Sequence, residues 1–181
     1  MFSTIVLAGG QSSRMGTDKA RLTIAGQPLW QRQVALAQQL GCVDIHVSHA
    51  QFGHPDRVPG WGPLSGLDTL LPVCRHAQVL VLAVDMPYLQ ADGLHPLLSN
   101  RGNHAVHYQD SVLPCVLYNS AALQDYVRQQ LHAQGQRSVQ RLLQHLGAQA
   151  IVCAQPQQLI NTNTPLEWLR AQQQQSAAEA L

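Results

Sequence analysis

The apolar residues of this chain are grouped in short runs that are separated by longer segments of mixed polarity. Within predicted strands at residues 4–8 and 78–84, residues 5–8 and 79–84 are apolar throughout and lack the alternation that marks a strand with one wet face. Such continuous character is typical of strands whose two faces are both covered. A third strand is predicted at residues 43–48. These segments therefore predict the core of a buried sheet.

Helical patterns separate these strands. Residues 28–40 have apolar positions on one helical face, with Pro28 at the opening and Gly41 as the stop. Shorter helices are predicted at residues 63–72 and 90–98. Regular alternation of strand and helix predicts a parallel sheet with right-handed crossovers.

The second half of the chain has a different pattern. Two apolar runs joined by a short turn predict an antiparallel hairpin within residues 105–118. Further elements are expected at residues 120–132 (helix), 139–146 (helix), 148–153 (strand) and from 165 (helix, capped by Thr164). The fold class predicted is α/β, with a mostly parallel sheet and an antiparallel hairpin in the second half.

Composition narrows the possible partners. The 181 residues suit one domain with a sizeable core, and 11 basic side chains nearly balance 10 acidic ones. This balance argues against nucleic acid or a membrane surface as a partner.

No apolar run reaches about 18 residues, and the first run ends at glycines, so we expect neither a membrane-spanning helix nor a signal peptide. The four separated cysteines indicate buried thiols in a reducing cytoplasm, and the scattered histidines do not suggest a zinc site.

A glycine-rich polar loop follows the first strand. Gly9 and Gly10 break the apolar run, and Arg14 and Lys19 supply positive charge. Glycines expose backbone N–H groups to an anion, so the loop favours phosphate binding, although a plain surface turn is the alternative. The spacing fits neither a Walker A loop nor the Gly-x-Gly-x-x-Gly dinucleotide pattern.

Asp85 directly follows the predicted strand at residues 78–84. Ligands in parallel sheets bind beyond the carboxyl ends of the strands, which brings this carboxylate to the phosphate loop. A carboxylate beside phosphate oxygens needs a cation between them, and Mg²⁺ is the usual one. The alternative is that Asp85 only caps the helix that follows.

The loop has a longer signature. Residues 7–19 read Leu-Ala-Gly-Gly-x-Ser-x-Arg-Met-Gly-x-Asp-Lys, which resembles the nucleotide-binding loop of the molybdenum cofactor guanylyltransferases, the MobA family. Residues 62–66 (Gly-Pro-Leu-Ser-Gly), 85–87 (Asp-Met-Pro) and 161–165 (Asn-Thr-Asn-Thr-Pro) resemble further motifs of that family. The resemblance implies a three-layer, Rossmann-like nucleotidyltransferase fold. It also implies a single domain with a nucleotide-binding half at residues 1–100 and an acceptor-binding half at 101–170, and the glutamine-rich composition predicts a polar tail at 171–181.

The resemblance also assigns roles to residues. Arg14, Lys19 and Asp85 would be catalytic, with Asp85 holding the metal. Asp56 is the candidate for guanine selection, because a carboxylate can accept from both N1–H and the amino group of guanine. Ser48 stands where the family often has Asn. The implied nucleotide-binding set is Leu7, Ala8, Gly9, Gly10, Lys19, Ser48, Asp56 and Asp85. The implied pterin-binding set is Pro114, Arg137, Asn161 and Asn163.

The function implied is Mg²⁺-dependent transfer of GMP from GTP to Mo-molybdopterin, with release of pyrophosphate. Proteins that deliver molybdopterin or mature molybdoenzymes would be its partners. The Gly9-Gly10 pair favours the guanylyl branch over the related molybdopterin cytidylyltransferases, which have Ala-Gly there. A cytidylyltransferase, a sugar-phosphate nucleotidyltransferase and a non-catalytic nucleotide-binding carrier of the cofactor remain as alternatives.

Overall fold

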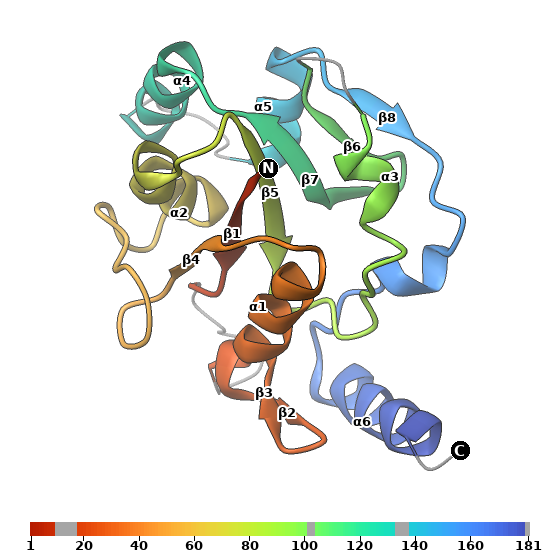
Figure 1. Cartoon of the computed structure of the whole chain (residues 1–181). Coiled ribbons are helices and arrows are strands. Elements are labelled where there is room, and N and C mark those ends of the chain that lie inside the picture. Colours follow the sequence, from red (N-terminus) through yellow and green to blue (C-terminus); the bar gives the residue numbers. More distant parts are fainter. Residues whose placement is uncertain (10–17, 101–103, 133–137, 180–181) are drawn as a thin grey trace.

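A six-stranded mixed sheet forms the centre of the protein, for which a computed structural model describes residues 1–9, 18–100, 104–132 and 138–179 (Figure 1). The strand order is β4-β1-β5-β7-β6-β8. The six strands are β1 (Ser3–Leu7), β4 (Asp44–Ser48), β5 (Gln78–Ala83), β6 (Val106–Tyr108), β7 (Ser111–Tyr118) and β8 (Gln149–Ile151). A separate two-stranded ribbon joins β2 (Thr23–Ile24) to β3 (Gln27–Pro28).

The pairing of the strands confirms the predicted fold class. β1 lies between β4 and β5 and is parallel to both, whereas β7 is antiparallel to its neighbours β5 and β6. β8 closes the sheet parallel to β6. The hairpin of β6 and β7 was predicted, but its place in the sheet was not. β7, although it follows β6 in the sequence, is the strand that pairs with β5 of the parallel half.

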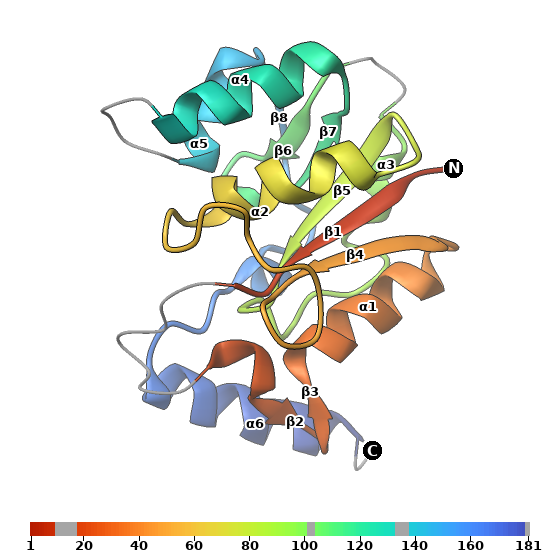
Figure 2. The same ribbon diagram turned by 90° about the vertical axis from the view of Figure 1, so that its left-hand side faces the viewer.

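Helices cover both faces of the sheet (Figure 2). One face packs against α2 (Pro63–Leu70), α4 (Ala121–His132) and α5 (Val139–His145), and the other against α1 (Leu29–Gln39) and α3 (His95–Leu98). α6 (Pro165–Glu179) packs beside β2. Three short segments are 3₁₀ helices: η1 (Lys19–Arg21), η2 (Leu71–Val73) and η3 (Pro156–Leu159). Among the helices that the structure describes, none has both the length and the apolar character needed to cross a bilayer.

Residues 5–8, at the end of β1 and directly after it, are apolar because each of them is buried. Ile5 and Leu7 belong to the cluster under α2, while Val6 and Ala8 belong to the cluster that includes Leu29 at the start of α1. Both faces of the strand are therefore buried, as the uninterrupted run of apolar residues predicts.

The helix predicted at residues 90–98 is shorter than expected. Turns occupy most of the segment, and only α3, at His95–Leu98, is α-helical. The buried side chain of Gln158 bonds to the start of this segment: its Oε1 accepts from the N–H of Gln90 at 3.1 Å, and its Nε2 donates to Asp92 Oδ1 at 3.0 Å. These contacts come from η3, far along the chain, and they hold the turns that precede α3.

The C-terminal helix is longer than expected. α6 continues to Glu179 and so takes in most of the segment 171–181, which the sequence assigned to a polar tail. Ala171 is fully buried, and Gln172 donates from Nε2 to the carbonyl of Thr23 at 3.0 Å. The start of the supposed tail is therefore packed against the β2–β3 ribbon.

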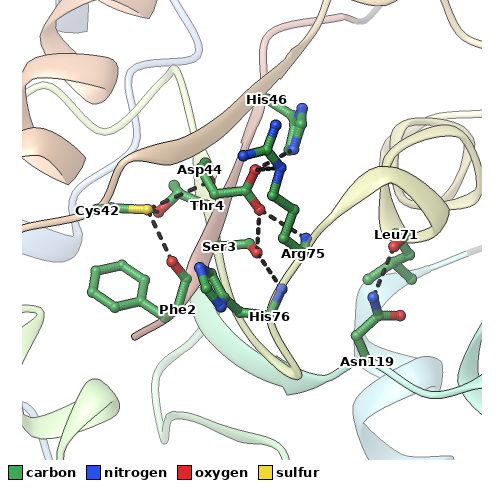
Figure 3. A network of polar contacts seen from close by, with 10 residues as sticks. All are labelled: Phe2, Ser3, Thr4, Cys42, Asp44, His46, Leu71, Arg75, His76 and Asn119. Carbon is green, nitrogen blue, oxygen red and sulfur yellow. Dashed lines mark hydrogen bonds and ion pairs between the residues drawn. The ribbon is translucent and has the colours of Figure 1, made fainter.

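A polar network ties together the strand starts at the end of the sheet opposite the carboxyl edge (Figure 3). Its centre is the buried Asp44 carboxylate, whose Oδ2 accepts from Ser3 Oγ at 2.5 Å and from the N–H of Arg75 at 2.8 Å. His46 Nε2 lies 3.2 Å from Asp44 Oδ1. Burial alone would raise the pKa of Asp44, but the bonds from Ser3 and Arg75 and the nearby His46 hold it below the ordinary value.

We expect Asp44→Asn to lower the free energy of unfolding by about 1–3 kcal/mol, because the charged acceptor of two hydrogen bonds is lost. The folded protein depresses the pKa of Asp44, so this stabilisation is present at neutral pH and is lost as the pH falls from about 4 through the folded-state value. Urea denaturation of both proteins between pH 7 and 3 measures the difference. Equal stabilities at pH 7 would contradict the prediction.

Candidate active site

Three parallel strands end at one edge of the sheet, and the residues that follow them form the site. Ala8, directly after β1, donates its N–H to the carbonyl of Ser48 at the end of β4, at 3.2 Å. Val84, directly after β5, donates to the carbonyl of Leu7 at 3.3 Å. These bonds extend the ladder past the strands, so the loops after β1, β4 and β5 start side by side.

Lys19 connects the loop after β1 to two other parts of the chain. Its Nζ lies 3.4 Å from Asp85 Oδ2 and donates to Asn163 Oδ1 at 2.8 Å. The Lys19 and Asp85 side chains are 18% and 25% exposed, so solutes can reach the charges of both. Asp18 fixes the start of η1, because its Oδ1 accepts from the N–H of Ala20 at 3.1 Å.

The segment before α6 is bonded to the backbone at Asp85. The N–H of Thr162 donates to the carbonyl of Asp85 at 2.8 Å, and Thr162 Oγ1 lies 3.3 Å from the same oxygen. Thr162 is buried, whereas Asn161 and Asn163 on either side of it are exposed. Anchoring Thr162 thus presents the two asparagines to the site.

A cavity of about 270 Å³ opens between these residues. Its lining includes the predicted residues Leu7, Ala8, Gly9, Lys19, Asp85 and Asn161. Val112 and Leu113, from the start of β7, form part of its wall. A cation and a carboxylate that face one small cavity suit a phosphate group together with a metal ion.

A second cavity, of about 420 Å³, shares Gly9 with the first. Its lining includes His49 and Asp56, and glycines of the loop before α2. Ser48 Oγ, which is buried, donates to Asp56 Oδ1 at 2.6 Å and so fixes the orientation of that carboxylate. A Cβ atom at Gly9 would lie 3.6 Å from Asp56 Oδ2, at the junction of the two cavities. Gly9 therefore borders both cavities, and a side chain there would make only an ordinary van der Waals contact with Asp56.

Comparison with known proteins identifies the family. Residues 4–150 match the MobA-like NTP transferase domain. The chain belongs to this family. A molybdenum cofactor guanylyltransferase of Xanthomonas euvesicatoria pv. vesicatoria (strain 85-10) is 34% identical over 173 residues, which cover 92% of each chain. A probable molybdenum cofactor guanylyltransferase of Trichormus variabilis (strain ATCC 29413 / PCC 7937) is 33% identical over 186 residues, covering 90% of this chain and 86% of that one.

Solved structures confirm the nucleotidyltransferase fold of the MobA-like family. Molybdopterin-guanine dinucleotide biosynthesis protein A from Archaeoglobus fulgidus superposes with a TM-score of 0.69 at 19% identity, over 98% of this chain and all of that one. A nucleotidyl transferase from Methanothermobacter thermautotroptrophicus reaches a TM-score of 0.74 at 17% identity, over 98% and 99% of the two chains. The predicted Rossmann-like architecture is confirmed.

The structure brings most of the predicted MobA-like site residues to one edge of the sheet. Leu7, Ala8, Gly9, Lys19, Asp85 and Asn161 line the first cavity, Asp56 lines the second, and Asn163 bonds to Lys19. Ser48 is buried behind this surface and acts on Asp56. Pro114 is buried within β7. Gly10, Arg14 and Arg137 lie outside the described residues.

His49 is a site residue that sequence reasoning did not select. Its Nδ1 accepts from the N–H of Gln51 at 3.1 Å, so the ring proton is on Nε2, which donates to Asp18 Oδ2 at 2.9 Å. The ring also stacks on Phe52 with centroids 3.6 Å apart. His49 thereby connects the second cavity to the start of η1. Its place directly after a strand at the ligand-binding edge was the only available signal.

Proposed function

We propose that this MobA-like protein transfers GMP from GTP to Mo-molybdopterin. The observation that carries the proposal is the pair of cavities that meet at Gly9, one lined by Lys19 and Asp85 and the other by Asp56. A nucleotide can place its phosphates against the first pair and its base beside Asp56. The printed names of the relatives, molybdenum cofactor guanylyltransferases, supply the acceptor.

The reaction needs positioning and neutralisation of charge more than covalent chemistry by the protein. The terminal phosphate of the acceptor attacks the α-phosphorus of GTP, a phosphoanhydride bond forms, and the bond to the β-phosphate breaks. Pyrophosphate takes the electron pair of that bond. Lys19 binds the phosphates and offsets the negative charge on the leaving group. In this proposal the asparagines at 161 and 163 face the acceptor side.

The single carboxylate of Asp85 suits a divalent metal that takes most of its ligands from the substrate phosphates and water. Within the described ranges there is no group of three or more His, Cys, Asp or Glu side chains that could hold a metal alone. Mg²⁺ is commonly held by one or two carboxylates together with phosphate oxygens and waters. Asp85, partly exposed beside Lys19, is the carboxylate that would hold it, and the metal would supply charge stabilisation to the phosphates.

Pyrophosphate release tests the function directly. Purified protein is incubated with Mg²⁺, Mo-molybdopterin and either GTP or CTP, and we expect release with GTP only. Release with CTP alone would instead identify a cytidylyltransferase. Nucleotide binding without release, in the presence of loaded acceptor, would favour a non-catalytic carrier.

Asp56→Asn is expected to lower kcat/KM for GTP by about 10–100-fold, because one charged acceptor facing guanine is replaced by a group that also carries donors. The rate with CTP should stay at its low initial value. Ser48→Ala, which removes only the 2.6 Å hydrogen bond that orients Asp56, should give a smaller loss with GTP. Initial rates of pyrophosphate release, measured with GTP and with CTP in separate reactions, give both effects. Unchanged discrimination in Asp56→Asn would remove this residue from base selection.

A further inference from the structure

Glu167 lies in the first turn of α6, outside the lining of both cavities, yet it is bonded to the segment that contacts Lys19. Its Oε2 accepts from the N–H of Asn163 at 2.7 Å and from the N–H of Thr164 at 2.9 Å. Thr164 Oγ1 in return accepts from the N–H of Glu167 at 3.3 Å. One carboxylate oxygen thus holds two consecutive backbone groups in place.

The bond from Glu167 fixes the backbone that carries the Asn163 side chain. Asn163 Oδ1 accepts from Lys19 Nζ at 2.8 Å, and on the other side Thr162 is tied to the carbonyl of Asp85 at 2.8 Å. Residues 162–163 are therefore held at both ends, by Asp85 and by Glu167. The side chain between these anchors meets the cation that faces the phosphate cavity.

The charge of Glu167 depends on the same neighbours, Asn163, Thr164 and Lys19. The N–H groups of Asn163 and Thr164 hold the pKa of the Glu167 carboxyl below its ordinary value, and the positive charge of Lys19 lowers it further. Glu167 is therefore ionised across the neutral range, when its oxygen is the strongest acceptor for these N–H groups.

We propose that Glu167 is a positioning residue for nucleotidyl transfer, which holds Asn163 against Lys19 so that the ammonium is aimed at the phosphates. The inference rests on the proposed function for its kinetic consequence. Glu167, the acid in the first turn of α6, would then position Asn163 in addition to exchanging hydrogen bonds with Thr164. The chain of contacts runs from Glu167 to Asn163 and from there to Lys19.

A purely structural role is the competing explanation. A Thr residue followed three positions later by Glu forms a capping box, which stabilises the start of a helix. The two roles differ in their kinetic consequences. Loss of a cap lowers the melting temperature, whereas loss of positioning lowers kcat/KM through Asn163 and Lys19.

The experiment is a double-mutant cycle in the full chain, with pyrophosphate release from GTP as the assay. Glu167→Ala and Asn163→Ala should each lower kcat/KM by about tenfold, since small displacements of a positioning group carry such costs. The double variant should lose about tenfold as well, not a hundredfold, because both changes break one chain of contacts. Glu167→Gln retains a carbonyl acceptor and should recover most of the loss.

Thr164→Ala is the matched control. It removes the 3.3 Å bond at the same helix end while leaving the Glu167 carboxylate in place. We expect its melting temperature to fall as in Glu167→Ala, with kcat/KM within about twofold of wild type. Multiplicative losses in the double variant, or an equal loss of kcat/KM in Thr164→Ala, would overturn the positioning role.

One measurement separates this inference from the proposed function. Carboxyl NMR of the substrate-free protein follows the titration of Glu167, which needs no turnover. A pKa below the ordinary value is expected from the bonds to Asn163 and Thr164. An ordinary or raised pKa would overturn the inference even in an active enzyme. If wild-type protein releases no pyrophosphate while this pKa is lowered, the proposed function fails and the contact with Asn163 stands.

Discussion

Asp85→Asn is expected to lower kcat for pyrophosphate release by about 10³-fold or more while GTP binding persists. Loss of the carboxylate removes the protein's charged ligand for the metal, and metal stabilisation of the transferring phosphate is worth several kcal/mol, at about 1.4 kcal/mol per tenfold in rate. The asparagine amide keeps the size of the side chain beside Lys19. Initial rates at saturating Mg²⁺ and calorimetric titration with GTP measure the two effects separately.

The second cavity, which contains Asp56 and in the proposed function takes the base, is untouched by this substitution, so affinity for GTP should fall much less than kcat. Asp125→Asn is the matched control, because the Asp125 side chain is 65% exposed on α4 and pairs only at the surface with Arg128. Its rate should equal that of wild type. Full activity in Asp85→Asn would refute the metal role and leave Asp85 as a backbone anchor for Thr162.

The position of Asp85 could be predicted because it depends on local features. A fully apolar run marks a strand covered on both faces, and the first polar residue after such a strand lies at the ligand-binding edge. The same reasoning placed the loop after β1 and, through the family signature, Lys19. Several residues that line the first cavity, including Gly9, Lys19 and Asp85, could therefore be named before the structure was known, whereas Val112 and Leu113 were not.

Other features depend on contacts between distant segments, which no local pattern encodes. The bond between Ser48 and Asp56 closes an irregular loop, and the bond between Lys19 and Asn163 spans 144 positions. The place of β7 between β5 and β6 is also a matter of pairing partners, since strand propensity does not specify them. Gln158 likewise bonds to Gln90, at the start of the segment predicted as a helix at 90–98, from 68 positions along the chain.

Lys19→Met is expected to lower kcat/KM for GTP by about 10²–10³-fold. The substitution keeps the length and apolar stem of the side chain but removes the positive charge, so that Asp85 would face the phosphates without a cation from η1. Since the Lys19–Asp85 pair is partly exposed and 3.4 Å apart, its loss should change the melting temperature little. A large kinetic effect with a small thermal one is the signature expected of a substrate-binding cation.

Arg21→Met provides the matched control for charge at the same helical turn. The Arg21 side chain is 56% exposed and is paired with Asp18 at 3.6 Å, two residues from Lys19 but outside the lining of both cavities. Its kcat/KM should stay within about twofold of wild type, since the Arg21 charge is exposed, already paired with Asp18 and outside the lining of both cavities. The kcat/KM of Lys19→Arg should lie between those of Lys19→Met and Arg21→Met. A planar guanidinium keeps the positive charge but lacks the compact shape of the ammonium that fits between Asp85 and Asn163. Equal losses in Lys19→Met and Arg21→Met would mean that general electrostatic attraction of GTP, and not a specific contact with Lys19, explains the effect.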